Sequence, residues 1–213
     1  MIDTQNPDAP RYPVFAKSQD EVPFGVTPSQ TVGPYVHIGL FPTWENSGEA
    51  VPEDAPGRID VSFNVIDGAG QPIGDAMIET WQADAAGRFN SPTDPRGAAE
   101  ATPAGFRSLA RVFADESGTI VVHTVKPGAL PAEDGAVEAP HINVGLFARG
   151  MLERLYTRLY FPEDTDAHAS DPVLSAVPEA DRPKLIAEKT DRGYHLTIHV
   201  QNTEGRETPF FAL

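Results

Sequence analysis

Residues 59–65 read Ile-Asp-Val-Ser-Phe-Asn-Val, with an apolar side chain at every second position. Successive side chains of a β-strand point to opposite faces, so this alternation predicts a strand with one buried face. The next residues, 67–70, read Asp-Gly-Ala-Gly, a composition typical of a turn. The chain therefore contains at least one half-buried strand that ends at a turn.

Strand patterns of the same kind recur along the rest of the chain. Five further strands are predicted, at residues 76–83, 119–125, 142–147, 155–161 and 194–200. One helix is predicted at residues 182–189, because Pro183 suits a first helical turn. Several short strands separated by turn signals predict an all-β fold, a β-sandwich core with long loops and one or two short helices. We expect this domain to span residues 27–213, after an N-terminal arm at residues 1–26 that orders only against a partner or the domain itself.

The composition excludes several classes of protein. The 213 residues include 31 acidic and 16 basic side chains, so the net charge of −15 opposes binding to nucleic acid or to an acidic membrane surface. The absence of cysteine excludes disulfides, cysteine-based zinc sites and thiol nucleophiles. We find neither an apolar signal segment nor an apolar run of about 18 residues, so a cytoplasmic protein is the default expectation.

The pair His141-x-Asn143 is the first candidate for chemistry. Side chains two apart on a strand share a face, so a His-x-His pair here could hold one metal ion, but the second position is an amide, a weak ligand. A buried histidine bonded to a backbone carbonyl is an equally open interpretation of His141. His195 and His199 are about 13 Å apart if both lie on one strand, which argues against a shared metal. Structural roles are expected for His37 and His123.

Two other segments have a polar or charged character that suits ligand binding. Residues 27–35 form a glycine-containing polar stretch that ends in Tyr35, which is also compatible with an ordinary loop. Arg149 follows the predicted strand 142–147 and is either a surface cation or an anion clamp, for which the planar guanidinium is suited. No serine-nucleophile or phosphate-loop motif occurs.

Six segments in this order resemble the intradiol ring-cleaving dioxygenases, over about residues 27 to 213. They are Thr27-Pro-Ser-Gln-Thr-Val-Gly-Pro-Tyr35, Thr80-Trp-Gln-Ala-Asp84 with Gly87, His123-Thr-Val-Lys-Pro-Gly128, Ala139-Pro-His-Ile-Asn143, Leu146-Phe-Ala-Arg-Gly150 and Arg158-Leu-Tyr-Phe161. The resemblance implies a β-sandwich and a ferric ion held by two tyrosinates and two histidines in catalytic chains. Such chains use dioxygen to open a catechol ring between its hydroxyl-bearing carbons.

At the four ligand positions this chain departs from the catalytic pattern. Phe89 and Leu130 stand where the tyrosinates would be, His141 keeps the first imidazole and Asn143 replaces the second. Glu138 stands where catalytic chains carry an arginine, three residues before the first histidine. We therefore predict no catalytic residue and no iron in this chain, with Fe(3+) held by a homologous partner.

The resemblance implies a non-iron alpha subunit that pairs with an iron-bearing beta subunit in a hetero-oligomer. In that role Thr31, Gly33, Pro34, Tyr35 and Arg149 line the partner's pocket, which takes a small aromatic acid together with O2. An alternative is a stand-alone transthyretin-like binding module without a catalytic partner. A third possibility is an independent metalloenzyme that uses His141 with nearby carboxylates.

Overall fold

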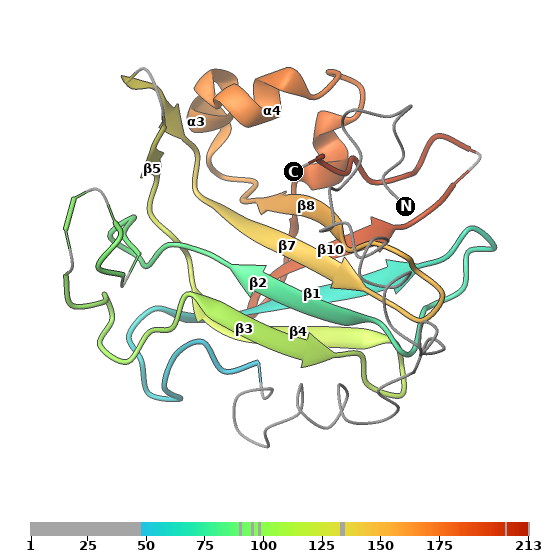
Figure 1. Ribbon diagram of the computed structural model, residues 1–213, viewed down its shortest axis with the longest axis horizontal. Coiled ribbons are helices and arrows are strands. Elements are labelled where there is room, and N and C mark those ends of the chain that lie inside the picture. The colour runs from blue at the N-terminus through green and yellow to red at the C-terminus, as the bar shows by residue number, and fades with distance from the viewer. Residues whose placement is uncertain are drawn as a thin grey trace, which may run out of the picture. The chain divides into compact units, whose positions relative to one another are not determined.

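The protein is described by a computed structural model covering residues 48–89, 91–94, 96–97, 99–132, 135–202 and 204–212. These residues form two four-stranded sheets and a two-stranded ribbon (Figure 1). The first sheet, in spatial order, is β4 (Thr119–Val125), β1 (Arg58–Ile66), β10 (Gly193–His199) and β9 (Glu188–Lys189). The second is β3 (Leu109–Phe113), β2 (Met77–Trp81), β7 (His141–Phe147) and β8 (Leu155–Tyr160). The ribbon pairs β5 (Leu130–Pro131) with β6 (Val137–Glu138).

The two sheets differ in strand direction. In the first sheet β1 runs parallel to β10 and antiparallel to β4, with Val61 opposite both Tyr194 and Val122. In the second sheet all neighbours are antiparallel, and β7 aligns His141 with Tyr160 of β8. This register decides which side chains meet at the candidate site.

The core lies between the two sheets. Alternate residues of β1, including Val61 and Phe63, are fully buried, and they share one apolar cluster with Ile142, Val144 and Leu146 of β7. Burying each such side chain contributes ~1.5–3 kcal/mol. Because Ile142 and Val144 point into this core, His141 and Asn143 point to the outer face of the second sheet.

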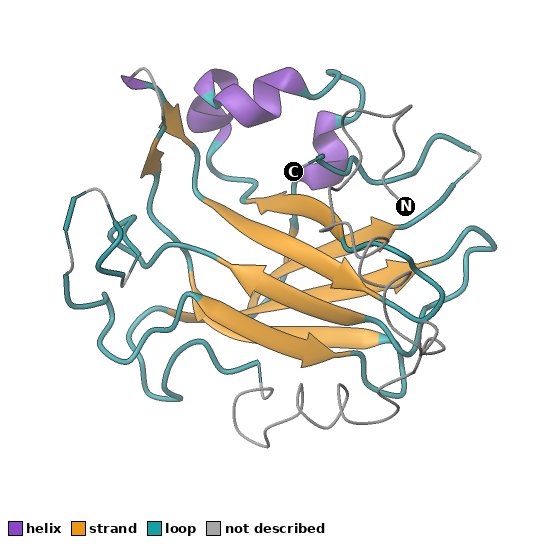
Figure 2. Cartoon of the chain, viewed as in Figure 1, coloured by secondary structure: helices purple, strands orange, loops and turns teal. Residues whose placement is uncertain are grey.

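Short helices lie beside the β8 edge of the second sheet, as Figure 2 shows. They are α3 (Thr165–Ser170), α4 (Pro172–Ala176) and the 3-10 helix η2 (Arg182–Leu185). A second apolar cluster joins Leu174 of α4 and Leu185 of η2 to Tyr160 of β8. The helices therefore bury the end of the sheet at which His141 lies.

The β-sandwich and all six predicted strands are confirmed, with boundaries shifted by one or two residues. The prediction of a helix at residues 182–189 is wrong except for a single 3-10 turn at Arg182–Leu185. After this turn Ile186 is extended, and Ala187 N donates a hydrogen bond to Tyr160 O, 2.9 Å away. Strand β3 and helices α3 and α4 were not predicted. In α4, Asp171 accepts a hydrogen bond from the Leu174 N–H (2.6 Å) and so caps the helix.

The predicted arm at residues 1–26 and the segment 27–35 lie outside the described residues. The boundary between residues 26 and 27 stays a prediction. Within the described part of the chain, no helix has the length and apolar character needed to cross a membrane.

Candidate functional site

The candidate site is centred on the start of β7, where His141 and Asn143 lie on the outer face of the second sheet. The side chain of His141 is 2% exposed. Its Nδ1 lies 2.8 Å from Ala139 O, and because a carbonyl oxygen can only accept, Nδ1 carries the proton. Burial lowers the pKa of His141, and the cation of Arg158 lowers it further, so the imidazole is neutral at pH 7. His141 is therefore a buried histidine that is hydrogen-bonded to a backbone carbonyl, one of the two possibilities that the sequence left open.

Arg158 of β8 occupies the space between Asn143 and Glu138. Its Nε donates to Asn143 Oδ1 at 3.0 Å, and its Nη1 donates to Glu138 Oε2 at 2.7 Å. The amide of Asn143 also donates to Trp81 O at 3.3 Å, so both ends of this amide have partners. The register that places Asn143 opposite Arg158 makes this arrangement possible. A fixed cation thus lies beside the position of the second imidazole.

The ring of Tyr160 lies against His141, with ring centroids 5.9 Å apart. It is fully buried, and this burial raises the pKa of its phenol well above the ordinary value. The hydroxyl donates to Asp171 Oδ1 at 3.3 Å, and Asp171 Oδ2 in turn accepts from Ala139 N at 2.7 Å. Tyr160 is therefore a neutral phenol that helps to hold the segment before β7, not a tyrosinate.

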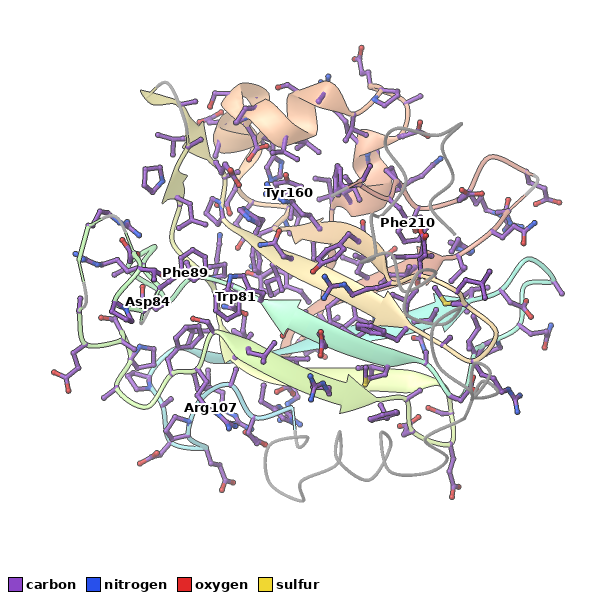
Figure 3. All side chains as sticks on the ribbon, viewed as in Figure 1. Trp81, Asp84, Phe89, Arg107, Tyr160 and Phe210 are labelled. Carbon is purple, nitrogen blue, oxygen red and sulfur yellow. The ribbon has the colours of Figure 1, made fainter. Side chains whose placement is uncertain are left out.

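Phe89 stacks on Trp81 at the end of β2, with ring centroids 5.4 Å apart and an interplanar angle of 11°. Figure 3 shows the two rings close to Asp84. Phe89 is the position at which the resemblance places the first tyrosinate. Phe89 offers no donor atom there, and its ring is used in apolar packing.

Asp84 organises the loop that carries Phe89. The carboxylate is 2% exposed and accepts backbone hydrogen bonds from residues 86, 88 and 102, at 2.8–2.9 Å. Gly87 has φ +71°, and a Cβ on Gly128 would lie 2.5 Å from Gly87 N. Two glycines are needed for this close approach of the loops that precede Phe89 and Leu130. No role was predicted for Asp84 from the sequence, although an Asp three residues before a Gly is a common turn signal.

Leu130 lies in the ribbon, where strand pairing places it opposite Glu138. The second tyrosinate position is thus brought next to the carboxylate that pairs with Arg158. Leu130 has no donor atom. The four positions that the resemblance marks as ligands are therefore gathered by the fold into one region, although their side chains are Phe89, Leu130, His141 and Asn143.

This donor set does not fit a ferric ion held by two tyrosinates and two imidazoles. Two positions are hydrocarbon, the amide is committed to Arg158 and Trp81, and a guanidinium lies where added positive charge would be repelled. Among the described residues, no group of three or more histidines and carboxylates could hold a metal ion. The possibility of a metal site built from His141 and carboxylates gains no support from this geometry.

Arg149 lies away from this region, just beyond the other end of β7. The six steps from His141 to Phe147 span about 20 Å of strand. The Arg149 side chain is 90% exposed, and its Nε lies 3.4 Å from Oδ2 of Asp75, whose side chain is 47% exposed. Leu152 in the same β7–β8 connection is fully exposed. The structure therefore does not bring Arg149 together with the degenerate ligand positions.

Two other described histidines have polar partners on the first sheet. His123 Nδ1 lies 2.8 Å from Asp60 Oδ1, and His195 Nδ1 lies 2.9 Å from Ser62 Oγ. His195 and His199 both lie on β10, as predicted. His37 lies outside the described residues.

Residues 43–201 match the family model described as "Dioxygenase". The fold, the six ordered motifs and this match agree, and the chain belongs to the intradiol dioxygenase family. The chain is 39% identical to the Protocatechuate 3,4-dioxygenase alpha chain of Pseudomonas putida over 200 residues, which cover 87% of this chain and 95% of the relative.

Two further comparisons place the chain more broadly. It is 32% identical to the Protocatechuate 3,4-dioxygenase beta chain of Burkholderia cepacia over 205 residues, covering 90% of this chain and 80% of that one. The crystal structure of hydroxyquinol 1,2-dioxygenase from Pseudomonas putida DLL-E4 shares the fold, with a TM-score of 0.54 and 18% identity, and the match covers 86% of this chain and 68% of that one. Nothing in these comparisons favours a stand-alone transthyretin-like binding module.

Proposed function

We propose that this chain is the non-iron alpha subunit of a protocatechuate 3,4-dioxygenase. It pairs with a homologous beta subunit that holds Fe(3+), and the complex converts protocatechuate and O2 to 3-carboxy-cis,cis-muconate. The observation that carries the proposal is the replacement of three of four ligand positions, with Arg158 hydrogen-bonded to Asn143, one of the three replacements. The similarity to both alpha and beta chains supports a pair of homologous subunits. A cytoplasmic location stays a prediction.

In this role the chain itself carries out no redox step and contributes to the pocket of its partner. We assign Arg149, with Thr31, Gly33, Pro34 and Tyr35, to the wall of that pocket. The exposure of Arg149 supports this, because its ion pair with Asp75 is a surface pair worth only ~0–1 kcal/mol. The guanidinium is therefore free to turn toward a substrate carboxylate and offset the cost of desolvating it. The exposed Leu152 beside it offers apolar surface to a partner.

Co-expression with a homologous chain that keeps the four ligands tests the subunit assignment. The complex is purified through a tag on this chain and compared with the chain expressed alone, and both are assayed for iron and for oxygen uptake with protocatechuate. We expect the chain alone to be iron-free and inactive, and the complex to contain iron and to consume oxygen. Stoichiometric iron and turnover in the chain alone would contradict the proposal.

Arg149 can be tested separately in the active complex. Loss of a charge-assisted hydrogen bond costs ~1.5–3 kcal/mol, so Arg149→Gln should lower kcat/KM for protocatechuate by about 10- to 100-fold. The matched control is Arg192→Gln, which removes another exposed arginine with a carboxylate partner. Catechol lacks the carboxylate, so its turnover should change little. Equal losses for both substrates would show that Arg149 does not act on the carboxylate.

A further inference from the structure

A cavity lies on the outer face of the first sheet, whereas the site described above lies on the second sheet. It has a volume of about 200 Å³ and is lined by Lys184, Thr197, His199, Arg206 and Thr208. All five side chains can donate hydrogen bonds, two are cationic and none is a carboxylate. In a chain with a net charge of −15, such a group of donors is notable. The lining chemistry is that of an anion site.

Three segments of the chain build this cavity. Thr197 and His199 lie on β10 with their side chains on the face away from the core, and Lys184 comes from η2. The C-terminal segment is held against β10 by two hydrogen bonds, from Thr208 N to His199 O and from His199 N to Thr208 Oγ1, each 3.0 Å. These two hydrogen bonds to the backbone of His199 fix the position of Thr208 beside it.

His199 has an unused polar atom. Its Nδ1 is buried and has no hydrogen-bond partner among the described residues. Burial lowers the pKa of His199, and the charge of Arg206 lowers it further, so the ring is neutral at pH 7. His199 lines the cavity, and its neutral ring has one N–H that can donate to an oxyanion there.

The two cations have carboxylate partners that an anion must compete with. Lys184 Nζ lies 2.5 Å from Asp181 Oδ1, and Arg206 Nη2 lies 2.5 Å from Glu204 Oε2. The side chains of Arg206 and Glu204 are 61% and 70% exposed, so their ion pair is weak and easily exchanged. Arg206 is thus the cation most free to turn into the cavity, and Lys184 the more restrained one.

We propose that this cavity is a binding site for a small oxyanion, either phosphate or the carboxylates of an organic acid. Arg206 and Lys184 supply charge, and His199, Thr197 and Thr208 supply hydrogen bonds. The site is separate from the degenerate iron region and does not depend on the role proposed for this chain. Its occupation would join η2, β10 and the C-terminal segment through one ligand.

Calorimetric titration at constant ionic strength tests the site, using the full-length chain with any partner that co-purifies. Sodium phosphate is the first probe and citrate the second, with sodium chloride as the blank. We expect saturable binding of one of the two anions. Arg206→Gln and Lys184→Gln should each weaken it about tenfold, whereas Arg192→Gln, an exposed arginine outside the cavity, should leave it unchanged.

A residue-specific readout accompanies the titration. Histidine ring signals are followed by NMR, and the signal of His199 is assigned as the one lost in His199→Asn. It should move with the same dissociation constant as the calorimetric one. Saturation by phosphate assigns an inorganic ligand, and saturation by citrate alone assigns an organic acid. The proposal is overturned if neither anion saturates, if both cavity variants bind like the parent protein, or if the His199 signal does not move.

Discussion

Removing the Arg158 cation should destabilise the fold by a measurable and partly recoverable amount. Arg158→Met keeps most of the apolar stem but leaves Glu138 without its partner and Asn143 Oδ1 without its donor. Breaking a fully buried ion pair costs ~3–5 kcal/mol, and breaking an exposed one ~0–1 kcal/mol. The side chains of Arg158 and Glu138 are 16% and 20% exposed, which places this pair between the two limits. We expect a loss of about 2 kcal/mol, or a decrease in Tm of about 4–8 °C for a chain of this size.

A double-mutant cycle separates the charge from the packing. Glu138→Gln in the Arg158→Met background removes the unpaired carboxylate, so the double variant should lose less than the sum of the two single losses. Unfolding by urea and by heat is followed on the full-length protein, with Arg192→Gln as the exposed control, for which a change under 0.5 kcal/mol is expected. A loss below 0.5 kcal/mol for Arg158→Met, or strictly additive losses, would refute the reasoning.

Three further outcomes follow from other parts of the structure. Burial alone would raise the pKa of Glu163, but hydrogen bonds from Lys126 and Tyr194 outweigh it and hold the pKa at about 2. The ionised Glu163 therefore stabilises the fold above about pH 4.5, and this contribution is lost as the pH falls toward 2. Glu163→Gln should thus flatten the acid limb of a curve of Tm against pH. Gly87→Ala should lower the free energy of unfolding in urea by about 3 kcal/mol, because a Cβ would collide with a backbone carbonyl. Gly70→Ala is the control, with a similar positive φ but open space around it, and should lower this free energy by about 1 kcal/mol. Equal losses would argue against the collision. Asp84→Ala removes the acceptor of three backbone N–H groups and should cost about 3 kcal/mol by the same assay, and a loss under 1 kcal/mol would mean that the loop holds without it.

The sequence carried most of the fold because the strand signals are strong and local. The alternation in residues 59–65 reports directly which face is buried, and the structure buries Val61 and Phe63. The helix prediction at 182–189 failed because that apolar pattern serves two elements. Leu185 of η2 packs in one apolar cluster with Tyr160 of β8, and Glu188 then pairs with His195 in the sheet. A short apolar pattern cannot distinguish these outcomes without the tertiary partner.

The candidate site was predictable position by position but not as a network. Phe89, Leu130 and Asn143 could be read as replaced ligands because their motifs align with the family. The role of Arg158 depends on strand register, since its contacts to Asn143 and Glu138 cross 15 and 20 residues of sequence. The preference of a guanidinium for these partners is general, but only pairing of β7 with β8 brings them within reach.

The contact between Arg158 and Asn143 has an evolutionary consequence. Asn143→His, the first step back toward a four-ligand set, would remove the oxygen that accepts from Arg158 Nε and place a second imidazole beside a fixed cation. A tyrosine at position 89 or 130 would add a hydroxyl before any metal could use it. Each reversion is therefore unfavourable by itself, and only several together could be useful. A change at any one of these positions therefore disturbs existing packing or hydrogen bonding without completing a four-ligand set, so this contact holds the chain in a supporting role.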